Sequence, residues 1–240
     1  MIRYAERIEH CNVLGPGERA VVWVHGCCFH CKGCIADSYK HGPYQEVTPE
    51  AMADWYCGNG KRTEGITISG GEPFLQAASL VKMLRIIRQR HEIGVIVYTD
   101  FLYEKLLARA QTDEAVREFL GEIDLLIDGP YIEEMDENRM AVGSENQRIL
   151  LLTDRYQNVA EEYYGKKARQ VEIRLFDGKG MLVGVPSEEQ RRMWKKLSEK
   201  PNSTDLEQTE VKEYEKRIYR KRATGDRGGY NGVKAESDGR

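Results

Sequence analysis

The sequence predicts an α/β fold, in which helices cover a parallel sheet that is open or curled into a partial barrel. Short apolar runs such as residues 20–24 (AVVWV) are typical of buried parallel strands. Apolar residues also recur at helical spacing after one of these runs, at Ala77, Leu80, Val81, Leu84 and Ile87. Because strand and helix signals alternate along residues 1–186, helical crossovers between parallel strands are expected.

Each element follows from a local pattern. Strands are expected over residues 20–24, 66–69, 95–98, 125–127, 149–152, 171–175 and 181–185. Helices are expected from Thr48-Pro49 to about Tyr56, over 77–87 and around 103–110. A turn is expected at Asp177-Gly178. In sheets of this kind the functional side chains gather at the carboxyl ends of the strands.

Composition restricts the function classes. The 36 Lys and Arg against 39 Asp and Glu give a net charge of −3, which argues against a dedicated nucleic-acid binder. Apolar runs are short and the N-terminus lacks the apolar core of a signal peptide, so we expect no membrane span and a cytoplasmic protein. Disulfides are rare in that compartment, so the clustered cysteines indicate metal or redox chemistry.

Residues 187–240 differ from the rest of the chain. They carry a net charge of +3 against −6 for residues 1–186, and they are poor in large aliphatic residues. We therefore expect a boundary near Pro186, between a core over 1–186 and a charged extension over 187–240. Ser187 and Gln190 predict a capping box at the start of a helix over 187–200. A second charged helix is expected over 205–222 and disorder beyond it, either as a partner-docking arm or as a solvated tail.

The first chemical motif is CCFHCKGC at residues 27–34, directly after the first predicted strand. Cys27, Cys31 and Cys34 have the spacing C-x3-C-x2-C. Three thiolates on one loop can hold three irons of a [4Fe–4S] cluster and leave the fourth iron open for a substrate. The alternative is a structural zinc knuckle. Its fourth ligand would be Cys28, His25 or His30.

The second motif is SGGEP at residues 69–73, directly after the next strand. Gly70 and Gly71 let the backbone approach a ligand closely. Glu72 can accept a charge-assisted hydrogen bond from an ammonium group. Pro73 is typical of the first residue of a helix, so an ordinary turn between strand and helix explains the motif equally well when it is taken alone.

Together and in this order, the two motifs resemble those of the radical S-adenosylmethionine (SAM) superfamily. The resemblance implies a partial (β/α)6 barrel of TIM type, with a [4Fe–4S] cluster on the three cysteines and SAM chelated by the open iron. Gly70, Gly71 and Glu72 would hold the methionyl ammonium. An electron from the reduced cluster would break the C–S bond, giving methionine and a 5′-deoxyadenosyl radical that abstracts hydrogen.

A third series narrows the resemblance. The segments are GPGER at 15–19, LLIDGPY at 125–131, GSENQR at 143–148 and GVP at 184–186. In this order they are similar to segments of the activating enzymes of anaerobic (class III) ribonucleotide reductases. This implies that the partner is a glycyl radical enzyme of that type, which loses hydrogen from a glycine. Flavodoxin or ferredoxin would supply the electron.

The resemblance also gives roles to single residues. Gly33 stands where many radical SAM enzymes have an aromatic residue, so it is expected to lie against SAM while adenine packs near Phe29 or Tyr39. Thr99 and Asp128 end two strands and would contact the SAM ribose or a monovalent cation near its carboxylate. Capping a helix or a turn explains these two residues equally well.

Two residues leave alternatives open. Arg148 pairs either with a carboxylate of SAM or of the partner, or with a surface acid. Val142 stands where the activating enzymes carry arginine, which keeps open a radical SAM enzyme that modifies a ribosomal peptide or a small molecule. An alternative of another class is a non-catalytic zinc-binding interaction module.

Overall fold

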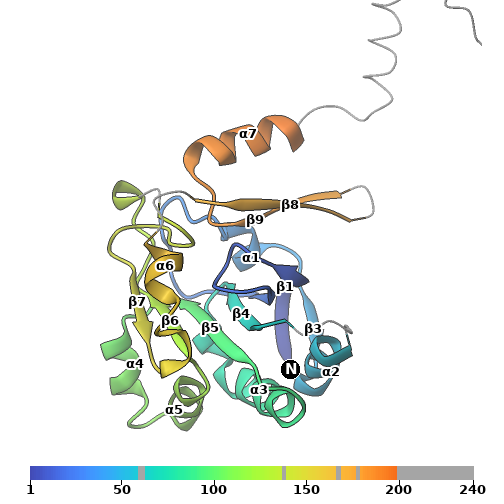
Figure 1. The fold of residues 1–240 in the computed structure, drawn as a ribbon, viewed down its shortest axis with the longest axis vertical. Helices are drawn as coiled ribbons and strands as arrows, with labels where there is room; N and C mark the ends of the chain where they lie inside the picture. The colour runs from blue at the N-terminus through green and yellow to red at the C-terminus, as the bar shows by residue number, and fades with distance from the viewer. Residues whose placement is uncertain (59–62, 137–138, 166–168, 177–178, 199–240) are drawn as a thin grey trace, which may run out of the picture. The chain divides into compact units, whose positions relative to one another are not determined.

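The computed structural model describes residues 1–58, 63–136, 139–165, 169–176 and 179–198. Its centre is a seven-stranded sheet of order β3-β1-β2-β4-β5-β6-β7 (Figure 1). The strands are β1 (Ile2–Cys11), β2 (Arg19–Val24), β3 (Gln45–Val47), β4 (Gly65–Gly70), β5 (Gly94–Thr99), β6 (Leu125–Asp128) and β7 (Arg148–Leu151). The expected parallel arrangement is confirmed for β2, β4, β5 and β6.

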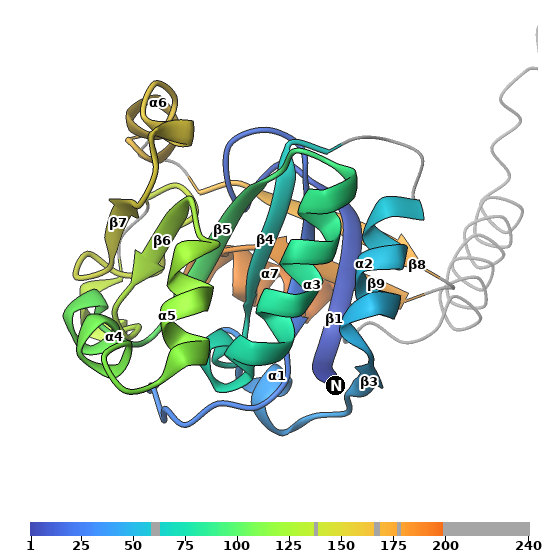
Figure 2. The same ribbon diagram turned by 90° about the horizontal axis from the view of Figure 1, so that it is seen from below.

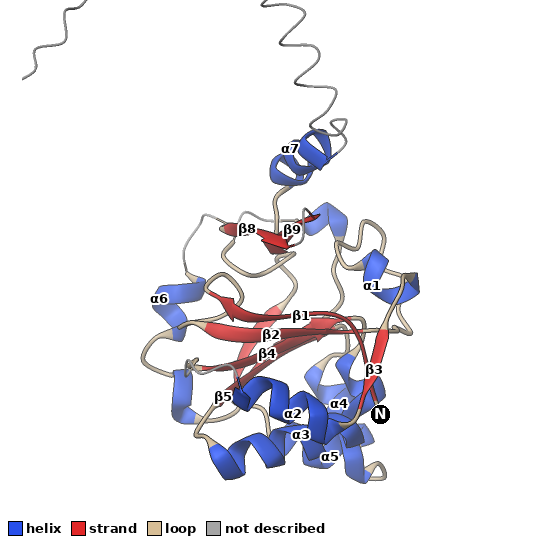
Figure 3. Cartoon of the chain, turned by 90° about the vertical axis from the view of Figure 1, so that its right-hand side faces the viewer, coloured by secondary structure: helices blue, strands red, loops and turns tan. Residues whose placement is uncertain are grey.

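Helices cover one face of this sheet (Figures 2 and 3). They are α2 (Pro49–Gly58), α3 (Ala77–Arg90), α4 (Tyr103–Arg109) and α5 (Glu114–Gly121). Leu80 and Leu84 of α3 belong to the same buried cluster as Val22, Ile68 and Val95 of the strands. The 3-10 helix η1 (Pro73–Gln76) connects β4 to α3 and begins at the proline of the second motif.

A second core lies on the opposite face. Val21, Ile96 and Leu125 are buried there with Ala160 of α6 (Ala160–Tyr164) and Val183 of the terminal hairpin. That hairpin consists of β8 (Val171–Phe176) and β9 (Lys179–Gly184). The remaining short helices are α1 (Asp37–His41), η2 (Glu133–Met135) and η3 (Asp154–Tyr156). Burial on both faces explains why the central strands are continuously apolar in sequence.

Three features differ from the sequence prediction. β1, β3, α1, α5 and α6 were not predicted, although Ile2, Tyr4 and Ile8 of β1 are buried with more exposed residues between them. β7 runs antiparallel to β6, and the described part of the connection between them holds the short 3-10 helix η2 and no α-helix. The last two predicted strands pair with each other as the turn predicted, but they form a two-stranded sheet separate from the main one. The predicted Asp177-Gly178 turn lies outside the described residues.

The chain divides into two compact units, Met1–Arg192 and Met193–Arg240. Helix α7 (Glu188–Ser198) begins with the predicted capping box. The Ser187 backbone N–H donates to Gln190 Oε1 at 2.8 Å, and the Gln190 N–H donates to Ser187 Oγ at 3.2 Å. The predictions for residues 205–240 fall outside the described part. Within that part, every helix is too short or too polar to cross a membrane.

Candidate functional site

The cysteine motif forms the loop that leaves the carboxyl end of β2. All six cysteines of the chain are free thiols, and Cys27, Cys31 and Cys34 are partly buried. The loop turns on itself, because the Cys34 N–H donates to the Cys31 carbonyl oxygen at 3.3 Å. The Phe29 N–H donates to Cys27 Sγ at 3.4 Å. One short loop thus presents the three thiols at the edge of the sheet where ligands are expected.

The SGGEP motif lies directly against this loop. The Gly71 N–H donates to the Val24 carbonyl oxygen at 2.7 Å, and the Glu72 N–H donates to the Gly26 carbonyl oxygen at 2.8 Å. A Cβ atom at Gly71 would lie 2.0 Å from that Gly26 oxygen, and one at Gly70 would lie 2.6 Å from the Val24 backbone. The two glycines therefore allow one motif to approach the backbone of the other.

The Glu72 carboxylate joins the ends of β4 and β5. It accepts hydrogen bonds from the Phe74 N–H at 2.9 Å, from Thr99 Oγ1 at 2.9 Å and from the Asp100 N–H at 3.1 Å. Burial raises the pKa of Glu72 to about 7, although these donors lower it. Glu72 and Thr99, both predicted to contact SAM, thus bind each other.

Asp100 and Lys40 bring opposite charges to the cysteines. Cys31 Sγ donates to Asp100 Oδ2 at 3.1 Å. Lys40 is a buried residue, and its ammonium donates to the Phe29 carbonyl oxygen at 3.4 Å. Burial raises the pKa of Cys27 to about 11 and that of Cys31 to about 12, so both are protonated thiols until a metal displaces the protons.

The three cysteines of the loop are a donor set that suits an iron-sulfur cluster. A structural zinc site needs four ligand atoms that converge on one ion. Within the described residues no three His, Cys, Asp or Glu side chains converge in this way. His25, a candidate fourth ligand, has Nε2 3.1 Å from the Gly42 carbonyl oxygen and stacks on Tyr44 at 4.3 Å. A cluster instead distributes three cysteines over three irons, which a short loop can supply.

Gly33 faces the segment after β6. Its φ of +69° favours glycine, and a Cβ atom there would lie 2.6 Å from Glu133 Oε1. Lys32 fixes this approach through Glu133 at 3.0 Å and Glu134 at 3.3 Å. The positive φ therefore accounts for glycine at this position, whereas the Glu133 carboxylate lies at the end of a flexible side chain that can move aside.

The two aromatic rings considered for adenine have partners of their own. Phe29 packs edge-on against Phe101 with ring centroids 4.8 Å apart. The Tyr39 ring centroid lies 6.0 Å from that of Trp23. Trp23 is buried on the face of the sheet opposite the covering helices, and Tyr39 packs against the same core.

Asp128 is engaged by a neighbouring strand and helix. It accepts from the Tyr103 N–H at the start of α4 at 2.7 Å, and from Arg148 Nε at 2.9 Å. Arg148 also binds Glu104 through two hydrogen bonds of 2.9 and 2.8 Å. Arg148 thus pairs with the exposed Glu104 and the buried Asp128, and Asp128 orients the start of α4.

The GSENQR segment holds the turn after β6. Gln147 Nε2 donates to the Gly129 carbonyl oxygen at 2.9 Å, and Asn146 Nδ2 donates to the Pro130 carbonyl oxygen at 2.8 Å. The guanidinium near Val142 comes from Arg169, which donates to the Val142 carbonyl oxygen at 3.0 Å and pairs with Asp136 at 2.7 Å. Arg169 is separated from this loop in sequence, so no local pattern could have indicated its contact.

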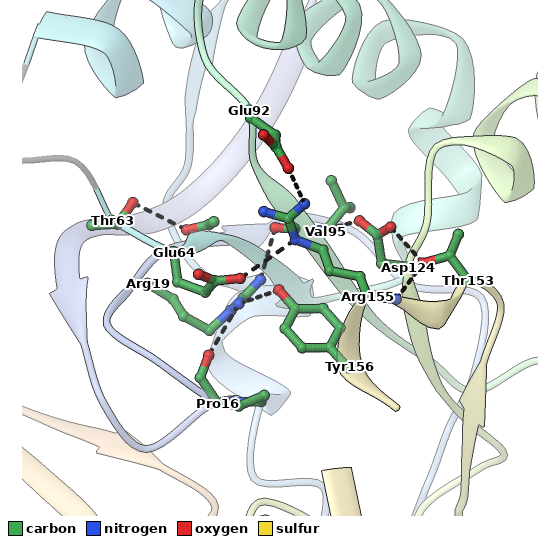
Figure 4. Close-up of polar contacts among 12 residues, drawn as sticks. Pro16, Arg19, Thr63, Glu64, Glu92, Val95, Asp124, Thr153, Arg155 and Tyr156 are labelled. Atoms are coloured by element: carbon green, nitrogen blue, oxygen red, sulfur yellow. Dashed lines mark hydrogen bonds and ion pairs between the residues drawn. The ribbon is translucent and has the colours of Figure 1, made fainter. Parts of the chain in front are cut away.

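The GPGER segment lies at the opposite edge, where the parallel strands begin (Figure 4). Arg19 is fully buried there. Its guanidinium makes hydrogen bonds of 2.6 to 3.2 Å with Thr67 Oγ1, Tyr156 Oη and the carbonyl oxygens of Pro16, Ile66 and Gly94. All five N–H donors of the guanidinium are satisfied by neutral oxygens of the protein. Arg19 therefore stabilises the sheet at the edge where its parallel strands begin, away from the candidate site.

Comparison with known proteins agrees with these observations. The family of 4Fe-4S single cluster domains matches residues 13–150. An anaerobic ribonucleoside-triphosphate reductase-activating protein of Vibrio cholerae is 31% identical over 147 residues, which is 57% of this chain and 90% of that protein. The protein of the same name from Haemophilus influenzae is 30% identical over 143 residues, 56% of this chain and 88% of its own length.

A further relative with this name comes from Enterobacteria phage T4. It is 28% identical over 155 residues, which is 62% of this chain and 94% of the phage protein. The matches thus cover the relatives almost completely, and the domain match includes both the cysteine loop and the SGGEP segment. The chain therefore belongs to the family of anaerobic ribonucleoside-triphosphate reductase-activating proteins and carries a 4Fe-4S single cluster domain.

Proposed function

We propose that the chain is a radical SAM activase, which installs a glycyl radical in an anaerobic ribonucleotide reductase. The observation that carries the proposal is the junction of its two motifs at one edge of the sheet. The Gly71 N–H binds the Val24 carbonyl oxygen at 2.7 Å and the Glu72 N–H binds the Gly26 carbonyl oxygen at 2.8 Å, directly before the cysteine motif. The names of the relatives support the same activity.

In this proposal Cys27, Cys31 and Cys34 hold a [4Fe–4S] cluster. When bound, the cluster supplies the electron that cleaves SAM into methionine and a 5′-deoxyadenosyl radical, which takes hydrogen from the target glycine. Residues 70–72 bind the methionyl ammonium of SAM, and Gly33 lies against SAM. The remaining task of the protein is to exclude water and to hold the target Cα–H close to the 5′ carbon.

Thr99 and Asp128 are proposed as further contacts at the ends of β5 and β6, for the ribose or for a monovalent cation. Hard oxygen ligands suit such a cation. The Thr99 hydroxyl and the Asp128 carboxylate currently bind Glu72 and Arg148. A ligand that binds Thr99 or Asp128 would therefore replace the hydrogen bonds of these residues to Glu72 and Arg148. SAM binding would in this way change the contacts between the ends of neighbouring strands.

The proposal extends to the architecture. We propose that β2, β4, β5 and β6 with their helices correspond to part of the partial (β/α)6 barrel of radical SAM enzymes. The barrel would be shortened here to four parallel strands. Residues 1–186 would be this core, and 187–240 an extension whose net charge of +3 suits docking to an acidic partner. Flavodoxin or ferredoxin in the cytoplasm is the proposed electron donor.

The test starts with anaerobic reconstitution of the full chain with iron and sulfide, followed by SAM and dithionite. We expect 5′-deoxyadenosine by chromatography and mass spectrometry, no product from Cys31→Ala, and product from Cys57→Ala. Cys57 is the matched control because it lies in α2, outside the loop. Addition of an anaerobic ribonucleotide reductase should then give the electron paramagnetic resonance (EPR) signal of a glycyl radical.

Each failure has a distinct meaning. Formation of 5′-deoxyadenosine without a radical on the reductase would favour the modification of a peptide or a small molecule. A protein that retains zinc and takes up no iron or sulfide would instead be the zinc-binding module, and the proposed activity would be wrong.

A further inference from the structure

Lys40 is a buried cation among the three cysteines of the loop. Its side chain belongs to α1, and the residue is 6% exposed. The ammonium donates to the Phe29 carbonyl oxygen at 3.4 Å. Its electrostatic field reaches Cys34, Cys27 and Cys31. The hydrogen-bond partner and the three thiols therefore all belong to the cysteine loop.

Two carboxylates also act on these thiols. Asp100 accepts a hydrogen bond from Cys31 at 3.1 Å, and both Asp100 and Glu72 disfavour a thiolate at Cys27. Lys40 acts on Cys27 and Cys31 in the opposite direction. When the cysteines bind metal they become thiolates. The site then holds several negative charges, and Lys40 is positioned to offset them.

Folding alone does not explain a lysine at this position. Removing an ammonium from water costs free energy, and an apolar residue of similar size would avoid that cost. Here the hydrogen bond goes to a carbonyl oxygen, which compensates a buried charge less than a carboxylate does. The placement becomes favourable once the thiols are ionised by a bound metal centre.

We propose that Lys40 is a positioning residue for the iron-sulfur cluster, whose ammonium offsets the thiolate charge and raises the cluster's reduction potential. The inference rests on the proposed function, because it requires a cluster on this loop. Reduction adds one negative charge to the cluster, and net charge and hydrogen bonds to sulfur set cluster potentials. A nearby cation therefore favours the form that has accepted the electron.

Lys32 is a matched control on the same loop. Its side chain is 77% exposed, and its ammonium pairs with Glu133 at 3.0 Å and Glu134 at 3.3 Å. Solvent and these two carboxylates screen its charge from the cysteines. Loss of the Lys32 charge therefore removes a lysine next to a ligand without removing the buried cation.

The experiment measures the reduction midpoint of the reconstituted full chain without SAM, by dithionite titration followed by EPR of the reduced cluster. At the wild-type midpoint, Lys40→Met should lower the ratio of reduced to oxidised cluster about tenfold, which is about 59 mV for a one-electron couple. Lys40→Arg and Lys32→Met should keep the midpoint of the wild type.

Equal midpoints for wild type and Lys40→Met overturn the inference and leave the proposed function intact. A wild-type chain that takes up no cluster overturns the proposed function itself. Should Lys40→Met fold by circular dichroism but take up no iron, restored uptake in Lys40→Arg supports the need for a cation, and equal failure overturns it. A Lys40→Met chain that does not fold also overturns it, because the ammonium would then be structural.

Discussion

Replacement of Arg19 by methionine removes five hydrogen-bond donors from the amino edge of the sheet (Figure 4). Hydrogen bonds to a charged group contribute about 1.5 to 3 kcal/mol each, so five of them sum to about 10 kcal/mol. Burial of the guanidinium costs several kcal/mol of lost hydration, which offsets more than half of this sum. We expect Arg19→Met to lower the free energy of unfolding by about 4 kcal/mol.

The assay is urea unfolding of the anaerobic, cluster-free protein, followed by far-ultraviolet circular dichroism. With a denaturant dependence of about 2 kcal/mol per molar urea, the midpoint should fall by about 2 M. Arg117→Met is the control, because Arg117 is exposed and its contacts are an ion pair with Glu114 at 3.1 Å and a long hydrogen bond to the Ala110 carbonyl oxygen at 3.4 Å. Its midpoint should remain within about 0.25 M of the wild type.

A shift below about 0.5 M for Arg19→Met would refute this reasoning, because lost hydration would then cancel the hydrogen bonds. The folded fraction of the variant should also bind a wild-type amount of iron, since Arg19 lies at the edge opposite the cysteines. Wild-type stability together with lost iron would instead assign Arg19 to the site.

Three further predictions concern the site and its surroundings. Gly71→Ala places a Cβ atom 2.0 Å from the Gly26 oxygen and should reduce iron uptake at least about tenfold. Gly121→Ala is the control, because its Cβ atom meets open space, and it should keep the iron uptake of the wild type. Equal iron contents in the two variants would exclude the steric argument. Because burial raises the pKa of Glu72 to about 7, the native apoprotein retains a proton that the unfolded chain releases, so stability should fall as pH rises from about 4.5 to 7. Urea midpoints at pH 5 and pH 8 measure this fall, which should be smaller in Glu72→Gln; an unchanged fall contradicts it. Arg169→Met should speed amide hydrogen exchange in the loop around Val142 and Gly143, whose carbonyl oxygens Arg169 binds. Unchanged exchange would show that Arg169 does not stabilise this loop.

Local patterns explain which elements could be predicted. The strands at 66–69 and 95–98 and the helix at 77–87 appear as β4, β5 and α3, because each has a complete apolar run or face of its own. The direction of β7 depends on the connection from β6 and not on the residues of the strand. The separation of the β8–β9 hairpin from the main sheet is likewise a matter of tertiary pairing.

The candidate site shows the same limit. The two motifs could be expected to meet, because the carboxyl ends of parallel strands share an edge. The partners of Glu72 and Asp128 could not be expected, since Thr99 and Arg148 come from other strands. Lys40 also carries no pattern of its own, because its meaning depends on the way α1 folds back onto the cysteine loop.

The motifs that resemble the family do not all mark chemistry. A cluster with an open iron takes only three ligands from the protein. Few residues of the chain therefore need to contact the cluster or the substrate that it binds. Those atoms must nevertheless be held within fractions of an ångström, which requires a rigid sheet beneath them. Arg19 at the amino edge and Gln147 at the turn after β6 meet this need through buried hydrogen bonds to backbone oxygens. A buried polar side chain needs a hydrogen-bond partner for each of its polar groups. These two positions therefore demand a particular residue because of the fold around them, and not because of contact with a substrate.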